Sequence, residues 1–410
     1  MKAMKKMVMW VCSLAVAVSL AGCSASAKDA EKDQVLQALN ECAVYASDVL
    51  LDSAGKSRCD YNMILGQWFP YEEPWHTGQI ILGLVDAYRV TGNKHYLDAA
   101  ERAGKWWIGL EIKDNPKLEG MVAATHGDSR GNDHIVFSTV SDGSHGLFEL
   151  GKETGNETYT RVVTDAITWM LDNMYAPELG VCYDIVELKT GEVLKTDRDN
   201  LGLDLRPNTE GSPFYDAYLV TGEERFKDAH ILLANSLIEK QTPEGAWMDY
   251  HPNDKEEGTF HPRFNLWYAE SLLEAYELTK DRKYLEAAAK TARLYARAQR
   301  NDGTIYYDNY VDGRFDKGSI CGSAVAFAGI LWMRLAGYGY DEFVPNYERS
   351  AQWLLVNRYA QDHPDPNVRG AVVNTRYRNK KGRVWLTQRD VGTSFGLRFL
   401  AQYYTLKFGK

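Results

Sequence analysis

The chain has 410 residues and a formal net charge of −9, and 45% of its residues are hydrophobic. That length could hold two or three average domains, although single-domain toroids and barrels also reach it. The acidic balance argues against a nucleic-acid partner, because phosphates require a basic face. An anionic ligand is compatible with this balance where cations gather locally.

The N-terminus has the pattern of an export signal. Three lysines precede an apolar run over residues 7–20, and LAGC follows at 20–23. It resembles a bacterial lipobox, which implies that residues 1–22 are a signal peptide and that Cys23 carries a lipid; an ordinary signal peptide with an accidental cysteine is the alternative. Residues 23–30 would then be a polar tether and 31–410 a single catalytic domain. No later stretch approaches the ~20 apolar residues of a membrane span, so the lipid would be the only anchor, on the periplasmic or cell-surface side of a bacterial outer membrane.

The other cysteines give little information. Cys12 would leave with the signal, and Cys42, Cys59, Cys182 and Cys321 are too few and too scattered for a disulfide framework. The sequence has no CxxC pair and no HExxH motif. We therefore predict no metal site and no cofactor.

An internal repeat organises the chain. Four segments are variants of one unit and lie about 60 residues apart. In each, an apolar helix ends at a tight turn, and an amphipathic helix with an aromatic residue in its first turn follows. The segments are VTGNKHYLDAA (90–100), ETGNETYTRVV (153–163), VTGEERFKDAH (220–230) and LTKDRKYLEAA (278–288).

Helix hairpins in series, without alternating strands, predict an all-α fold: an (α/α) toroid of six hairpins, or seven if another pair is hidden in the long segments. The last helix has a natural partner in the first, which favours a closed ring over an open solenoid. The predicted helices span residues 31–52, 74–91, 94–108, 137–154, 156–174, 210–221, 223–240, 262–279, 281–300, 318–337, 343–358 and 392–408.

The connections between these helices alternate between short and long. In a toroid, all connections of one parity emerge on one face, and loops this long are usually functional. Three of them continue after a glycine with an aromatic-rich piece, at 177–184, 241–251 and 299–310, which we predict as short strands at the mouth. The long connections are 53–73, 109–136, 175–209, 241–261, 301–317 and 359–391.

Histidines concentrate on this predicted face. An imidazole can transfer protons near neutral pH, so a group of them on one face indicates chemistry. A buried structural histidine is the alternative for any one of them. Seven of the nine histidines lie on or beside the long loops: His76, His126, His134, His145, His251, His261 and His363.

The segment QRNDGTIYYDNY at 299–310 places Tyr306 close to Arg300. A neighbouring cation lowers the pKa of a phenol, so the two are a candidate proton-transfer pair. Scaffold packing is the commoner role of a tyrosine after a turn. Tyr307 has the opposite alternation along a strand, and we expect it to pack in the interior.

Charged residues offer two further patterns. Seven cations lie between residues 367 and 390, either as a solvated hairpin or as an electrostatic guide for a polyanion: Arg369, Arg376, Arg378, Lys380, Lys381, Arg383 and Arg389. Hydrolysis of a glycoside would instead need two carboxylates. No pair stands out by spacing among the candidates Glu72, Glu73, Asp142, Asp204, Glu210 and Asp390.

The lipobox, a toroid of this length and loop-borne His, Arg and Tyr together resemble the alginate and glucuronan lyases of polysaccharide lyase family 38. The resemblance covers the chain from about residue 31. Its local basis is Tyr-His at 250–251, with Arg300 and then Tyr306 six residues later, which is similar to the family's catalytic spacing. Unsaturated uronyl hydrolases and other toroidal hydrolases share the fold, so fold alone does not separate them.

The resemblance implies β-elimination on a 4-O-linked uronate polymer, which leaves a 4,5-unsaturated uronate. Tyr306 would donate the proton and also act as base for mannuronate or glucuronate, and Arg300 would hold its phenolate. His251 would be the base for guluronate. Asn132, with His126 or His134 beside it, would neutralise the sugar carboxylate. The other substrate-binding candidates are His261, Arg263, Trp75 and Arg389.

Two other functions remain as alternatives. A toroidal glycoside hydrolase would use two of the carboxylates and yield reducing ends without an unsaturated product. A surface lipoprotein that binds glycans without catalysis would retain a polysaccharide and release nothing. We expect a monomer whose partner is an anionic polysaccharide.

Overall fold

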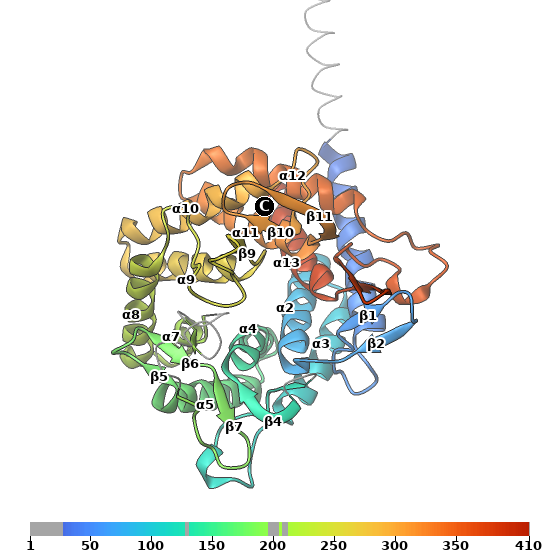
Figure 1. Cartoon of the computed structure of the whole chain (residues 1–410). Helices are drawn as coiled ribbons and strands as arrows, with labels where there is room; N and C mark the ends of the chain where they lie inside the picture. The colour runs from blue at the N-terminus through green and yellow to red at the C-terminus, as the bar shows by residue number, and fades with distance from the viewer. Residues whose placement is uncertain (1–27, 128–130, 196–204, 207–211, 410) are drawn as a thin grey trace, which may run out of the picture.

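The computed structural model describes residues 28–127, 131–195, 205–206 and 212–409. Twelve α-helices in this part of the chain form two concentric rings (Figure 1). The inner ring closes where the last helix packs against the first inner helix. The predicted (α/α) toroid of six hairpins is therefore confirmed. Cys23 and residues 1–27 lie outside the described residues, and residues 28–30 belong to the first helix rather than to a tether.

The helices have the predicted order, and their ends lie within four residues of the predicted positions. The first helix covers residues 28–45 and continues as the π-helical turn η1 (Ala46–Leu50). The inner ring consists of α2 (Glu73–Thr91), α4 (Phe137–Thr154), α7 (Pro213–Thr221), α9 (Phe264–Thr279), α11 (Gly322–Gly337) and α13 (Val391–Phe408). The rest of the outer ring consists of α3 (Lys94–Ile108), α5 (Glu157–Asn173), α8 (Glu224–Lys240), α10 (Arg282–Ala298) and α12 (Val344–Val356).

The repeated unit is the turn from an inner to an outer helix. In the first copy, the Thr91 hydroxyl donates to the Ala87 carbonyl oxygen at 2.7 Å and accepts from the next turn's backbone, while Gly92 takes the left-handed conformation (φ +67°) that ends α2. The fourth copy has Lys280 at this position, also with a positive φ of 60°. The aromatic residue of each copy is buried under the outer helix: Tyr96, Tyr159, Phe226 and Tyr284.

Inner helices approach each other very closely at one point. A Cβ atom on Gly78 of α2 would lie 2.1 Å from the carbonyl oxygen of Gly143 of α4. Only glycine allows backbones to approach so closely. Ion pairs also link inner helices, with Arg89 to Glu149 at 2.6 Å and Arg334 to Glu277 at 2.9 Å.

All strands in the described residues lie in or directly beside the six long connections, and they form four small antiparallel sheets with the strand orders β12-β13-β1-β2, β11-β10-β9, β3-β4-β7 and β5-β6-β8. Of the three predicted mouth strands, 177–184 and 299–310 contain strands, whereas 241–251 forms turns. The first seven strands are β1 (Asp60–Asn62), β2 (Gln67–Phe69), β3 (Thr125–Gly127), β4 (Gly131–Val136), β5 (Tyr175–Ala176), β6 (Val181–Tyr183) and β7 (Ile185–Glu187). The others are β8 (Leu205–Arg206), β9 (Thr259–Phe260), β10 (Tyr306–Tyr310), β11 (Phe315–Ile320), β12 (Thr375–Lys380) and β13 (Arg383–Gln388).

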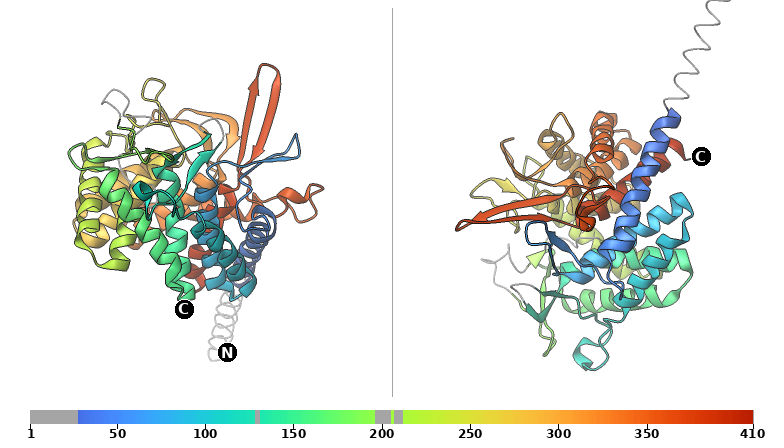
Figure 2. Two further views of the ribbon diagram at one scale, coloured as in Figure 1. Left: turned by 90° about the horizontal axis from the view of Figure 1, so that it is seen from below. Right: turned by 90° about the vertical axis from the view of Figure 1, so that its right-hand side faces the viewer.

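The long connections emerge together on one face of the ring. Figure 2 shows the β12–β13 hairpin projecting from this face, with the start of the first helix and the end of α13 on the opposite side. In the described part of the chain, no helix has the length and apolar character that crossing a bilayer requires. The long-loop face is therefore where a site built from several loops can form.

Candidate functional site

Two adjoining cavities open on the long-loop face. The inner cavity, of about 240 Å³, lies over the inner helices. The outer groove, of about 910 Å³, runs along the β12–β13 hairpin. Arg376 and Arg389 line both, so the two cavities form one continuous cleft. Beside these two arginines, the inner cavity is lined by Glu72, Trp75, His126, Ser138, Thr139, Asp142, His251, Pro252, His261, Arg263, Phe264 and Trp267.

Six of the ten predicted catalytic and binding residues meet in the inner cavity. They come from the loops before α4, α9 and α13 and from the first turn of α2. This meeting follows from the toroid, which gathers the loops of one parity. The six are Trp75, His126, His251, His261, Arg263 and Arg389.

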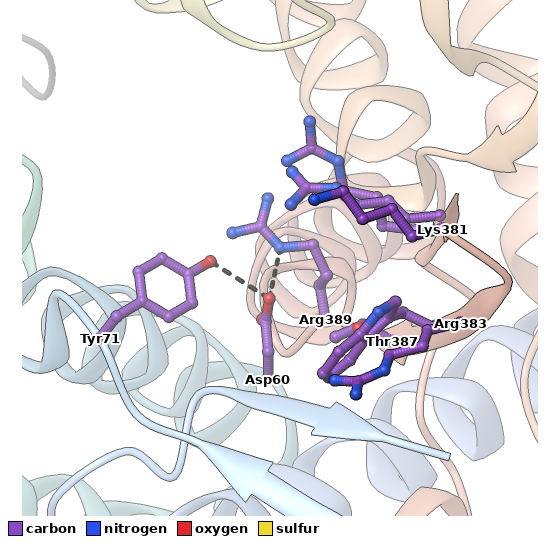
Figure 3. A pocket seen from close by; sticks show the side chains of 9 residues that line it. Asp60, Tyr71, Lys381, Arg383, Thr387 and Arg389 are labelled. Carbon is purple, nitrogen blue, oxygen red and sulfur yellow. Dashed lines mark hydrogen bonds and ion pairs between the residues drawn. The ribbon is translucent and has the colours of Figure 1, made fainter. Parts of the chain in front are cut away.

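Arg389 is fixed at the junction of the two cavities. Its Nε donates to Asp60 Oδ2 at 2.8 Å, and its guanidinium lies over the ring of Tyr71, whose hydroxyl donates to the same carboxylate at 3.2 Å (Figure 3). Burial raises the pKa of Asp60, although Arg389 opposes this shift. The arginine is thus held with its guanidinium directed into the cleft.

Beneath this junction, the hydroxyl of Tyr307 is a shared acceptor. It accepts from Nη1 of Arg263 and from Nη1 of Arg389, each at 3.3 Å, and from Nδ2 of Asn374 at 3.1 Å. Tyr307 is buried as predicted, with 5% of its surface exposed. Burial raises the pKa of Tyr307. Its role is therefore more than packing, because it holds two cleft-lining arginines.

A buried ion pair supports the loop before α13. Nδ1 of His76 lies 2.7 Å from Oδ1 of Asp390, and the Ser57 hydroxyl donates to the other oxygen of Asp390 at 2.9 Å. Burial alone would lower the pKa of His76 and raise that of Asp390, but the ion pair reverses both shifts. Asp390, the residue that follows Arg389, is thus anchored to α2.

Four predicted site residues do not line either cavity. Arg300 donates to the carbonyl oxygens of Ala298 (2.8 Å) and Arg297 (2.7 Å) and lies over the ring of Phe315, so it caps the end of α10. The predicted contact of Arg300 with the Tyr306 phenolate is wrong: the Tyr306 ring stacks on Phe315 instead, with ring centroids 5.3 Å apart.

The other two belong to the β3–β4 hairpin. Asn132 is exposed, and its Oδ1 accepts from the Thr125 hydroxyl at 3.0 Å. His134 pairs with Glu187 of β7 in the sheet register. Their predicted part in neutralising a substrate carboxylate has no support in these positions.

The carboxylates differ in their placement. Glu72 and Asp142 line the inner cavity, and Glu72 Oε1 lies 2.9 Å from Nε2 of His126. Asp390 is buried in its pair with His76, and Glu73 pairs with Lys56 at 2.8 Å. Asp204 and Glu210 lie outside the described residues.

Sequence reasoning missed Tyr71 and Asp60 as part of the cleft wall. Both lie in the first long connection, and only the general richness of that loop in polar and aromatic residues pointed to them. Within the described residues, no three His, Cys, Asp or Glu side chains are grouped so that they could hold a metal ion.

No protein-family model and no curated protein sequence matches the chain. Solved structures do match it. They include cellobiose 2-epimerase from Bacillus thermoamylovorans, with a TM-score of 0.64, 13% identity and coverage of 89% of this chain and 99% of that one. Unsaturated glucuronyl hydrolase from Streptococcus agalactiae matches with a TM-score of 0.60 and 13% identity, and the match covers 91% of this chain and 92% of that one. An α-1,6-mannanase from Salegentibacter sp. matches with a TM-score of 0.57 and 13% identity, and the match covers 91% of this chain and 99% of that one. At such low identity these similarities establish the shared toroid fold.

Proposed function

We propose that this chain is a polysaccharide lyase that cleaves 4-O-linked uronate polymers, alginate or glucuronan, by β-elimination. One observation carries the proposal. On a protein with a net charge of −9, Arg263, Arg376 and Arg389 line one cavity together with three histidines. A cavity with this lining suits a carboxylated sugar beside groups that transfer protons.

β-Elimination makes three chemical demands that such a cavity can meet. The proton on C5 is weakly acidic until the adjacent carboxylate is neutralised. A base then takes that proton, its electron pair forms the C4–C5 double bond, and the C4–O bond breaks. An acid finally protonates the leaving oxygen.

We assign these parts to residues that line the inner cavity. Arg376 and Arg389 neutralise the carboxylate, since they lie where the inner cavity opens into the groove. His251, from the loop before α9, is the base. His126, from the loop before α4 and paired with Glu72, is the proton donor. The two histidines come from different loops, before α4 and before α9, which suits an acid and a base that act on one sugar.

The reaction is tested by incubating the protein with alginate and with glucuronan. A lyase produces far-ultraviolet absorbance from the new double bond in step with new reducing ends. His251→Ala should lower kcat by about 10²-fold or more, the usual contribution of a positioned acid or base. His134→Ala is the matched control, because His134 lies on the same face but outside both cavities, and it should keep full activity.

A hydrolase is the second candidate, and it has its own observation: Glu72 and Asp142 both line the inner cavity. Two carboxylates that flank a glycosidic bond can supply the acid and the base of hydrolysis. This function predicts reducing ends without new absorbance and loss of activity in Asp142→Asn. Retention of polymer without any product would instead leave a glycan-binding protein.

A further inference from the structure

The β12–β13 hairpin presents its cations on one face. In its antiparallel register, Arg376 lies opposite Thr387 and Arg378 opposite Trp385. Alternate residues of a strand share a face, and so do directly paired residues of neighbouring strands. These four side chains therefore lie on the same face, together with Arg383, and all five line the outer groove.

The cations Arg378, Lys381 and Arg383 are exposed, and Arg376 lies over the ring of Tyr307. Among the described residues, no carboxylate forms an ion pair with Arg378, Lys381 or Arg383, whereas surface arginines elsewhere, such as Arg161 and Arg225, are paired. Burial and the neighbouring Arg376 lower the pKa of Arg378. Asp60 and Asp308 act on Arg378 in the opposite direction, but neither forms an ion pair with it. Like charges gathered without ion-pair partners favour an anion between them.

The groove continues the inner cavity. Arg376 and Arg389 line both cavities. Figure 3 shows Lys381, from the hairpin turn, and Arg389, which follows β13, extending towards the space that Tyr71 faces. The inner cavity, at about 240 Å³, is smaller than a typical ligand pocket of ~300–1,000 Å³. A polymer with one sugar in the inner cavity must therefore extend out of it. The aromatic residues Trp385 and Tyr71 also line the groove.

We propose that the outer groove binds the uncleaved part of an anionic polysaccharide, through carboxylates of sugars beyond the one that reacts. The protein then acts on internal bonds of long chains in preference to short oligosaccharides. This inference rests on the proposed function only in taking the inner cavity as the reacting site. The binding itself does not depend on turnover.

Binding is tested by electrophoresis in native gels that contain polymannuronate, polyguluronate or polyglucuronate, with a neutral mannan as reference. The double variant Arg378→Gln/Arg383→Gln should weaken retardation about tenfold, in the range of such electrostatic effects. Added salt should also weaken the retardation of the wild type, because salt screens the charges. The control Arg282→Gln/Arg293→Gln removes the same charge from α10 and should bind as the wild type does.

Kinetics give the second measurement. The groove variant should have a KM about tenfold higher on long polymer, while kcat/KM on a trisaccharide stays within twofold of the wild type. Lys381→Gln, a single exposed change in the hairpin turn, should shift KM in the same direction by a smaller factor.

The outcomes separate the two proposals. Wild-type retardation without any product would refute the lyase function and leave the groove as a polyanion site. Cleavage of long polymer with the same KM in the wild type and in the groove variant would refute polymer binding in the groove. Absence of retardation by all three polyuronates would also refute it, as would equal weakening by the α10 control.

Discussion

Replacing Tyr307 with Phe removes one hydroxyl on which three donors converge. Hydrogen bonds from charged donors contribute ~1.5–3 kcal/mol and neutral ones ~0.5–1.5 kcal/mol. The two guanidinium contacts are long at 3.3 Å, and Arg389 keeps Asp60 while Arg263 keeps the Ser323 hydroxyl at 3.2 Å. The summed loss is therefore smaller than three full bonds, and we expect the free energy of unfolding to fall by about 2–4 kcal/mol.

The same change should reduce activity. Arg389 lines both cavities, and without the Tyr307 hydroxyl its guanidinium loses one of its fixed contacts. Loss of positioning at a reacting centre can cost up to ~10²-fold in rate. Urea denaturation measures the first effect, and initial rates on the polymer measure the second.

Tyr306→Phe is the matched control, one residue away. It keeps the ring that stacks on Phe315, and the unfolding free energy should change by less than about 0.5 kcal/mol, with activity retained. Loss of turnover in Tyr306→Phe, together with wild-type stability and rate in Tyr307→Phe, would refute the role given to the Tyr307 hydroxyl. That result would favour the pattern inferred from the sequence over the contacts in the structure.

Three further predictions concern stability. Asp390→Asn leaves the buried His76 without its ionic partner and should lower the unfolding free energy by about 3–5 kcal/mol in urea titrations; a change below 1 kcal/mol would contradict this. Burial alone would lower the pKa of His145, but Asp216 at 2.7 Å raises it to about 9. The stability from this pair is thus fully present below the ordinary histidine pKa and is lost as the pH rises through about 9. The melting temperature of the wild type should therefore fall near that pH, whereas that of His145→Gln should not. Gly303→Ala forces a Cβ to 2.7 Å from a backbone oxygen at φ +90° and should cost about 1–3 kcal/mol, whereas an unchanged melting temperature would show that the turn can relax.

The fold could be predicted because its signals are local. Each inner helix of the repeat ends where a threonine hydroxyl bonds back to its own helix and the next residue takes a left-handed conformation, as at Thr91-Gly92. Such a signal does not depend on distant parts of the chain. The alternation of short and long connections then places the long loops on one face.

The site could be predicted only in part, because contacts between loops that are distant in sequence do not follow from a local pattern. Strand alternation favoured Tyr306 as the residue that faces the cleft. The pairing of β10 with β11 shifts register between Tyr306 and Asp308. Burial still alternates along β10, so Tyr307 lies on the buried side as predicted. The alternation did not show that Arg263 and Arg389 donate to its hydroxyl there. Residues that needed only to be on the correct loop, such as His126 and His251, were found.

The start of the first helix and the cleft lie on opposite sides of the ring. This arrangement bears on how the protein would be oriented at a membrane. If Cys23 carries the lipid that the lipobox resemblance implies, the five residue steps to residue 28 span at most about 17 Å. The ring adds the length of its helices, about 27 Å for the 18 residues of α13. The cleft would then open outwards, some tens of ångströms above the lipid headgroups. A bulky, heavily hydrated polymer could be engaged there from the surrounding medium without being pressed against the bilayer.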